Sequence, residues 1–284
     1  MSANTIATRT NVGSAAAQTN LRRSNHAIHQ SVGRLSSGLR VQSASDGAAS
    51  MAVSENMRAQ RGGFQRAQRN LTESVTVANT AESGYAAISD ILVRMKELAV
   101  EAANDSISDT ERGFLNTEFS AMADEIDRLV ESVEYNGNTL LNGTAGSAGT
   151  GVLTIQAGMR NSGNDQIDLT LDSTNSTDLG VNAAQTDVTD LASAQQAVED
   201  VDAAMETLNT ARTGVGAFIN RVGVALTSIE ASIEQVSVSL GNQRDASMSE
   251  ESATFNKEQV LQQAGVSMLS QANAQANIAL RLIG

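Results

Sequence analysis

The chain has 284 residues, no Pro, Cys or Trp, and only 2% aromatic residues, so its core must come from small and aliphatic side chains. That composition favours long helices packed side by side, and the lack of Cys excludes disulfides, thiolate zinc sites and cysteine nucleophiles. The formal net charge of −13 argues against nucleic acid as the main partner of the whole chain. No apolar run reaches the roughly 18 residues that span a bilayer, and the first residues lack the apolar segment of a signal peptide, so we expect no membrane insertion.

The first segment, residues 1–43, carries a weak helical stripe of apolar side chains. The stripe consists of Ala17, Leu21, Ile28, Val32, Leu35 and Leu39. A few large side chains have little to set against an ordering cost of about 1–2 kcal/mol per residue. We therefore expect this segment to fold only against the other end of the chain and against neighbouring copies.

Two stronger helical stripes follow. The first predicts a helix from about Ala44 to Asn104, in which the pair Gly62 and Gly63 interrupts the pattern and would allow a kink. The second predicts another helix, preceded by Ser108 and Glu111 at the spacing of a capping box. The first stripe is Phe64, Ala67, Leu71, Val75, Ala78, Ala81, Tyr85, Ile88, Leu92, Met95, Ala99 and Ala102, and the second is Leu115, Phe119, Met122, Ile126, Leu129 and Val133. A turn at residues 104–108 would place the two helices antiparallel.

Residues 140–186 differ from the rest in being rich in Gly, Asn, Ser, Thr and Asp. Two short alternating runs, residues 152–155 and 167–171, predict the strands of a β-hairpin. The Gly-rich stretch at residues 143–151 lacks the Lys of a phosphate-binding loop, and we interpret it as a flexible turn.

The longest periodic pattern lies in the C-terminal half. Small or apolar residues recur at alternating steps of three and four from Val188 to Leu240, over about seven heptads, which predicts a long coiled-coil-type helix of about 75–80 Å. Asp187 and Asp190 are its N-cap candidates. The closing segment, residues 242–284, returns to a sparse stripe: Leu261, Ala264, Met268, Ala272, Ala276, Leu280 and Ile283.

Charge is segregated along the chain. Residues 1–72 have a net charge of +7, residues 73–206 of −19, and residues 207–284 of −1. The basic segment contains no Lys and a single aromatic, Phe64, so it lacks the stacking platform of a nucleic-acid binder. Oppositely charged segments can instead pair within or between copies of the chain. A basic-arm nucleic-acid binder remains an alternative; it would show steeply salt-dependent DNA binding through Arg22, Arg23, Arg34 and Arg40.

No constellation of residues points to catalysis. His26 and His29 share a helix face but have no obvious third ligand nearby, so we expect no metal site. Neither His lies in a nucleophile motif, and the acids Glu118, Asp124, Glu125 and Asp127 have the pattern of a solvated helix face. We expect neither enzyme activity nor a cofactor.

Several motifs, in order, resemble the bacterial flagellins. The stretch at residues 34–41, RLSSGLRV, resembles the family's RLSSGLRI, and residues 45–54, SDGAASMAVS, are similar to its DDAAGLAIS segment. Further resemblances are TAESGY at residues 80–85, RMKELAV at 94–100, EIDR at 125–128, YNG at 135–137 and ANAQA at 272–276. The chain departs from the pattern at Gly47, at Ser50 and around Arg244 and Asp245.

The resemblance implies a mainly α fold: a long antiparallel helical bundle or coiled coil with a small β-hairpin excursion in the middle of the chain. It implies inner-core helices at residues 1–43 and 242–284, a helical shell at 44–139 and 187–241, and a short variable region at 140–186. The implied role is a structural subunit that self-assembles into the extracellular flagellar filament for motility, exported unfolded through the flagellar secretion channel. A hook–filament junction protein of the same fold is the alternative.

The resemblance also implies partners and contact residues. The partners are other copies of the chain, a flagellar secretion chaperone at the C-terminal segment, the hook–filament junction proteins, the filament cap and, for some flagellins, a Toll-like receptor. Inner-core assembly is assigned to Leu21, Ile28, Val32, Leu35, Leu39, Leu261, Met268, Leu280 and Ile283. Shell packing is assigned to Leu92, Met95, Leu115, Phe119, Ile126, Leu226 and Ile233, and receptor contact to Arg94, Leu98 and Glu118.

Overall fold

The structure is a computed structural model that describes residues 11–146 and 148–283, with side chains described as far as residue 275. The chain divides into two compact units, one made of residues 1–59 and 235–284 and the other of residues 60–234. The expected helical fold with a small antiparallel hairpin is confirmed. No helix in the described ranges has the length and apolar character needed to cross a membrane.

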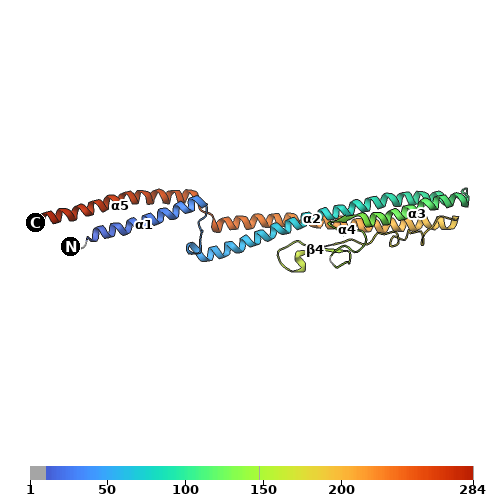
Figure 1. The fold of residues 1–284 in the computed structure, drawn as a ribbon, viewed down its shortest axis with the longest axis horizontal. Coiled ribbons are helices and arrows are strands. Elements are labelled where there is room, and N and C mark those ends of the chain that lie inside the picture. The colour runs from blue at the N-terminus through green and yellow to red at the C-terminus, as the bar shows by residue number, and fades with distance from the viewer. Residues whose placement is uncertain (1–10, 147, 284) are drawn as a thin grey trace. The chain divides into compact units, whose positions relative to one another are not determined.

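The first unit is built on two helices that lie side by side, α1 (Val12–Ser37) and α5 (Met248–Ile283) (Figure 1). It also contains the beginning of α2 (Ala44–Ala102) and the end of α4 (Leu191–Arg244). α1 ends at Gly38, whose φ of 72° is the left-handed geometry that glycine adopts without steric cost.

The second unit is a three-helix bundle of α2, α3 (Asp109–Ser132) and α4 (Figure 1). α3 begins with the expected capping box: Ser108 Oγ accepts a hydrogen bond from Glu111 N, and the Glu111 carboxylate accepts one from Ser108 N. Asp190 caps α4, since its Oδ1 accepts a hydrogen bond from Ser193 N at 2.9 Å, and this bond lowers the pKa of Asp190. Local sequence therefore sets the start of both helices.

The kink that Gly62 and Gly63 would allow does not form. α2 stays helical there, and its one non-helical residue is Gly47, with φ of 167° and ψ of 87°. Gly63 has a packing role instead, because a Cβ at this position would lie 2.9 Å from Cγ of Met159 in the hairpin loop. Two adjacent glycines suggest a helix break, but α2 continues through them. The missing side chain of Gly63 instead leaves room for the hairpin loop to pack against the helix.

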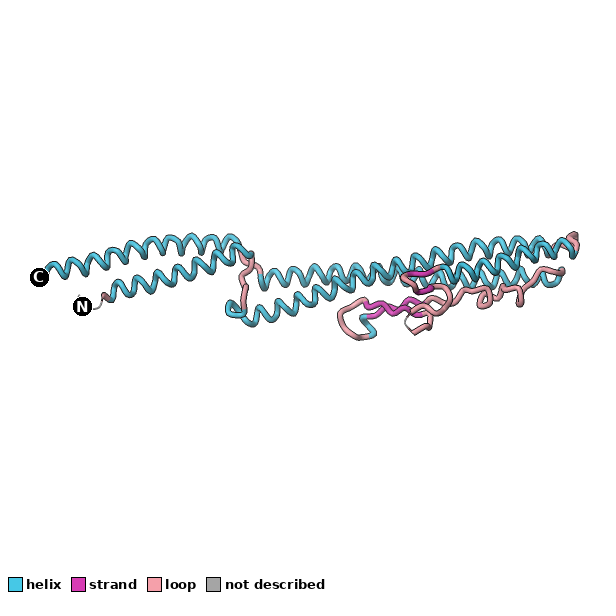
Figure 2. Tube along the Cα trace, viewed as in Figure 1, coloured by secondary structure: helices cyan, strands magenta, loops and turns pink. Residues whose placement is uncertain are grey.

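The chain between α3 and α4 forms two small antiparallel pairs (Figure 2). β1 (Glu134–Tyr135) and β2 (Asn138–Thr139) are joined through Asn136 and Gly137, whose φ values of 52° and 79° suit a tight hairpin turn. β3 (Val152–Gln156) pairs with β4 (Gln166–Thr170), which confirms the predicted hairpin, and the structure gives the register as Thr154↔Asp168. A short 3-10 helix, η1 (Gly163–Asp165), precedes β4.

The fully buried side chains of the second unit form one continuous core. It contains Tyr85, Leu92, Met95, Phe119 and Ile126, together with Leu169 and Leu171 from the hairpin region. Ser176 ties that region to α3, because its N–H and its hydroxyl both donate to the Asp127 carboxylate, at 2.7 and 2.8 Å. The second unit therefore has a core that needs no other chain.

Candidate assembly surface

The α1–α5 pair is aligned by polar side chains. Asn11 Oδ1 accepts a hydrogen bond from Ser14 N at 2.9 Å, while Asn11 Nδ2 donates to the Ala272 carbonyl at 3.1 Å. Farther along, Gln262 Nε2 donates to Asn25 Oδ1 at 2.6 Å. These bonds fix which turns of the two helices face each other, so the pair has a defined register.

The same pair has almost no apolar interior. The buried residues of α1 are three serines, Ser14, Ser24 and Ser31. Among the described residues of the first unit, Val41 is the one fully buried large hydrophobic side chain. Because serines contribute little to hydrophobic stabilisation, the pair gains much less from folding alone than the second unit does.

Large apolar side chains of the pair face outward instead. Val32 and Leu261 are each 46% exposed and Met268 is 62% exposed, while Val12, Val260 and Val266 are more than half exposed. Leu21, Ile28, Leu35 and Leu39 are half-buried. The side chains of Leu280 and Ile283 lie outside the described ones. Each described position assigned to inner-core assembly therefore keeps apolar surface available to another chain.

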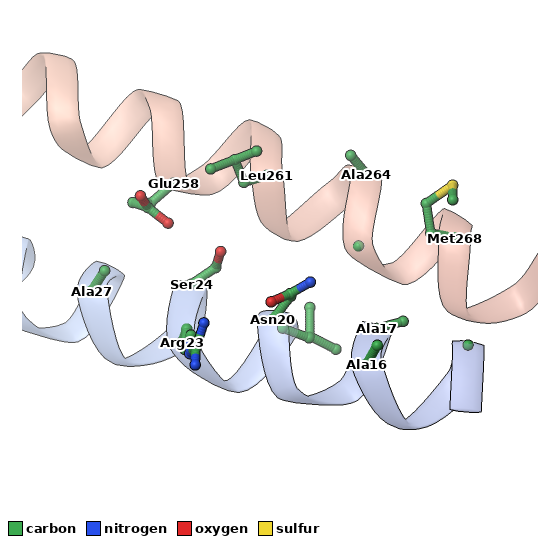
Figure 3. Close-up of a pocket in the computed structure, with 13 residues that line it drawn as sticks. Ala16, Ala17, Asn20, Arg23, Ser24, Ala27, Glu258, Leu261, Ala264 and Met268 are labelled. Atoms are coloured by element: carbon green, nitrogen blue, oxygen red, sulfur yellow. The ribbon is translucent and has the colours of Figure 1, made fainter. Parts of the chain in front are cut away.

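A groove of about 640 Å³ runs between the two helices (Figure 3). Its walls are mostly small or apolar, and the side chains of Ser24 and Glu258 point toward the opposite helix. The lining residues from α1 and α5 include Ala16, Ala17, Leu21, Leu261, Ala264 and Met268. Small side chains on both walls leave an open apolar seam of the kind that a further helix can fill.

Near the end of α1 and the start of α5, ion pairs and a backbone hydrogen bond connect the segments of the first unit. Arg34 Nη1 lies 3.0 Å from Glu251 Oε1, and Arg244 Nη1 lies 3.1 Å from Glu55 Oε1. Ala246 N donates to the Gly38 carbonyl at 2.9 Å. The motif around residues 34–41 thus meets the divergent region around Arg244, a contact between segments about 200 residues apart in the sequence.

Asp46 organises the start of α2. Its carboxylate accepts hydrogen bonds from the backbone N–H groups of Ser43 and Gln42 and from the Ser43 hydroxyl, at 3.0 to 3.2 Å. The bond from the Ser43 backbone is the largest cause of a lowered pKa of Asp46. Asp46 is the acidic residue of the SDGAAS motif, and its carboxylate holds the backbone at the start of α2 in place. Gly47, which departs from the family pattern at the next position, has no side chain that could accept such hydrogen bonds.

The positions assigned to shell packing lie in or against the core of the second unit. Leu92, Met95, Phe119 and Ile126 are fully buried, and the partly buried residues packed against them include Leu115, Leu226 and Ile233. These side chains are engaged within the chain, so they are poorly placed to make contacts between copies.

The residues assigned to receptor contact do not share one environment. Arg94 and Glu118 are exposed and form an ion pair, with Arg94 Nη2 2.7 Å from Glu118 Oε1, and Glu118 is the largest cause of the raised pKa of Arg94. Leu98 is fully buried and belongs to the hydrophobic core of the second unit. The assignment of Leu98 to a surface contact is therefore wrong.

Arg112 has a structural role that the sequence did not indicate. Its side chain is buried, and its guanidinium donates to the carbonyls of Ala102 at 2.9 Å and Asn104 at 3.0 Å while contacting Asp109 at 2.8 Å. It thereby satisfies the Ala102 carbonyl at the end of α2, which has no helical partner, and also binds the Asn104 carbonyl in the turn that follows. The ERG triplet at its position offered no local signal, since the acceptors come from the preceding helix.

The described residues provide no cluster of three or more His, Asp or Glu side chains that could hold a metal ion. His26 and His29 lie on the exposed side of α1, and the ring of His26 contacts Gln30 at 3.2 Å.

Comparisons with known proteins place the chain among flagellar proteins. Residues 9–146 match the model of the bacterial flagellin N-terminal helical region, and residues 198–283 match that of the C-terminal helical region. A flagellin of Halalkalibacterium halodurans is 32% identical over 88% of this chain and 89% of its own length. The flagellar filament 30.7 kDa core protein of Treponema maltophilum is also 32% identical, over 91% of this chain and 93% of its own length. A solved structure of a putative flagellar hook-associated protein from Vibrio parahaemolyticus is similar in fold, with a TM-score of 0.58 at 16% identity, covering 70% of this chain and all of that one.

Proposed function

We propose that this chain, which belongs to the bacterial flagellin family, polymerises with copies of itself into the extracellular filament of a flagellum, a structural role rather than a catalytic one. The observation that carries the proposal is the contrast between the two units. The second unit has a closed hydrophobic core, whereas the α1–α5 pair buries serines and leaves its valines, Leu261 and Met268 accessible.

Hydrophobic burial supplies the driving force for that assembly. A fully buried Leu, Val or Met contributes roughly 1.5–3 kcal/mol relative to the exposed side chain. Packing α1 and α5 of neighbouring copies against the groove of each pair would cover several such side chains at once. The proposed inner-core segments are residues 1–43 and 242–284, and the proposed shell segments are 44–139 and 187–241.

The composition is compatible with export as an unfolded chain through the flagellar secretion channel. A chain without Pro avoids slow prolyl isomerisation when it refolds, and a chain without Cys needs no oxidation. A secretion chaperone on the C-terminal segment, the filament cap and the hook–filament junction proteins are the proposed partners. We propose the exposed pair Arg94 and Glu118 as the receptor-contact residues.

Truncation of α5 tests the assembly proposal. A chain lacking residues 262–284 retains every core residue of the second unit, and we expect a largely helical monomer that fails to elongate filament seeds. A full-length variant with Leu261→Asn and Met268→Asn should raise the protein concentration needed for elongation, with little change in helix content by circular dichroism. Filaments formed by the truncated chain under the electron microscope would overturn the proposal.

A hook–filament junction protein is the second candidate, and the fold similarity to the hook-associated protein favours it at the level of fold alone. A junction protein forms a limited ring, so the purified chain would not elongate seeds. Sustained growth of filaments from seeds therefore decides between the two functions.

A further inference from the structure

The basic side chains of the second unit fall into two groups. Five of them form ion pairs within the unit: Arg94, Lys96, Arg112, Arg128 and Arg212. The other five, Arg61, Arg66, Arg69, Arg160 and Arg221, have no carboxylate within 4.0 Å among the described residues. In a chain with 32 acidic and 19 basic residues, cations left without an acidic partner are unexpected.

The five unpaired arginines lie at one end of the unit. Arg61, Arg66 and Arg69 belong to the first turns of α2 within it. Arg160 follows Met159, whose side chain packs on Gly63. Arg221 lies on α4 between Arg212, which pairs with Glu82, and Glu230, which accepts a hydrogen bond from Gln68. We call this set the arginine end.

Acids near this set along the chain form no ion pair with any of the five arginines among the described residues; they include Asp165, Glu230 and Glu234. Glu230 accepts a hydrogen bond from Gln68 Nε2 at 3.2 Å, and Asp165 accepts one from the backbone N–H of Arg160 at 2.9 Å. Arg66, Arg69 and Arg160 are exposed. Their guanidinium groups therefore face solvent and are free to bind carboxylates from outside the chain.

The opposite end of the unit is strongly acidic. Residues 96–112 and 187–202 together hold ten acidic and two basic residues. Lys96 of the first segment pairs with Asp202 of the second at 2.5 Å, and Val188 N donates at 3.1 Å to Oδ1 of Asn116, four residues beyond the first segment. Both bases are occupied, Lys96 by Asp202 and Arg112 by Asp109 and backbone carbonyls. We call these two segments the acidic end; Glu101 and Asp105 are exposed there and form no ion pair among the described residues.

We propose that the arginine end of one copy docks on the acidic end of the next, so that charge fixes the direction and register in which copies stack. The partner is a second copy of this chain, and the inference rests on the polymer proposed above. Stacking in one direction brings opposite charges together at every contact, whereas opposed copies would bring two acidic ends together, and like charges facing each other are costly. The net charge of −13 disfavours a polyanion such as nucleic acid as the alternative occupant.

Charge reversal at each end tests the proposal in the full chain. Arg66→Glu with Arg69→Glu, and separately Glu101→Arg with Asp105→Arg, change exposed residues and should leave the circular dichroism of the monomer unchanged. We expect each double variant alone to elongate seeds at least about tenfold more slowly than the unmodified chain. An equimolar mixture of the two should grow, because an alternating polymer pairs opposite charges at every contact. The chain with all four substitutions should also grow.

The design separates the possible failures. If the unmodified chain does not elongate seeds, the proposed polymer itself is overturned. If it grows and both double variants grow equally well, the docking of these two ends is overturned. Failure of both the mixture and the fourfold variant would also overturn it, as would faster growth of Glu101→Arg with Asp105→Arg, since less net negative charge alone would then control assembly. If the glutamates disturb folding, Arg66→Gln with Arg69→Gln gives the milder version, which should still slow elongation.

Discussion

Arg34 of α1 and Glu251 of α5 form an ion pair of 3.0 Å between residues 217 positions apart in the sequence. Glu251 is buried and Arg34 is partly so, which distinguishes this pair from the solvent-exposed pairs on the helix surfaces. It joins the last turn of α1 to the first turn of α5. The pair therefore holds together an element that has almost no apolar core of its own.

Removing Arg34 should loosen the α1–α5 pair. Arg34→Ala leaves a buried carboxylate without its cation, and such a loss typically costs about 1–3 kcal/mol. We expect faster hydrogen exchange in α5 around Glu251 in the assembled polymer, where α5 is protected, and a higher protein concentration for polymerisation. Arg58→Ala is the matched control, because Arg58 pairs with Glu55 on an exposed helix face at 3.4 Å. Equal effects of the two variants would refute a special role for the Arg34 pair.

Gly84 should be intolerant of a side chain. A Cβ there would lie 2.6 Å from Leu141 Cδ1 and 3.0 Å from Val133 Cγ2, so Gly84→Ala forces two packed side chains to move. Overpacking of this kind costs roughly 1–3 kcal/mol, so Gly84→Ala should lower the free energy of unfolding of the second unit by about that amount. Gly113→Ala is the control: Gly113 lies in α3 with nothing within 4 Å of its Cβ position, and alanine should stabilise that helix by about 0.5–1 kcal/mol. Urea unfolding followed by circular dichroism compares them, and a Gly84→Ala chain as stable as the original would contradict the packing.

The Glu111 capping box should make α3 sensitive to acid. Hydrogen bonds from the backbone and hydroxyl of Ser108 hold the pKa of Glu111 below its usual range in the folded chain. Because the folded pKa is lowered, the stabilisation is present above the unfolded pKa of about 4.3 and is lost as pH falls through the folded value.

Glu111→Gln should therefore lower the melting temperature at pH 7 and have progressively less effect below pH 4, roughly, as the unmodified Glu111 becomes protonated. Glu131 is exposed near the other end of α3 and has no hydrogen-bond partner in the described structure. Glu131→Gln should therefore have little effect on the melting temperature at either pH. A melting-temperature difference for Glu111→Gln that stayed constant down to pH 3 would rule out this role of the carboxylate.

Elements governed by neighbouring residues could be predicted from the sequence. The capping box at Ser108, the hairpin strands and the long α4 helix all follow from patterns within a few residues or from one repeated spacing. The terminal stripes indicated helices with little to bury, and the serines of α1 agree with that.

Features that depend on a distant segment were missed or misread. Gly63 suggests a helix break in the sequence, and its packing role appears only once Met159 of the hairpin loop is placed against it. The role of Arg112 depends on the Ala102 carbonyl at the end of the preceding helix. Leu98 was assigned to receptor contact from the family resemblance alone, and the apolar stripe predicted for α2 did not include it. Two helices pack on α2, so its buried face is wider than that stripe, and Met95, Leu98 and Ala99 are all buried.

Hydrogen exchange of a dilute monomer shows whether α1 and α5 are stable without neighbouring copies. If α1 and α5 depend on neighbouring copies, amides in residues 12–37 and 248–275 should exchange almost without protection while those around Leu92 and Phe119 remain protected. In assembled polymer, both terminal segments should become strongly protected. Strong protection of α1 and α5 in the isolated monomer would contradict the account, because the pair would then be stable without any other chain.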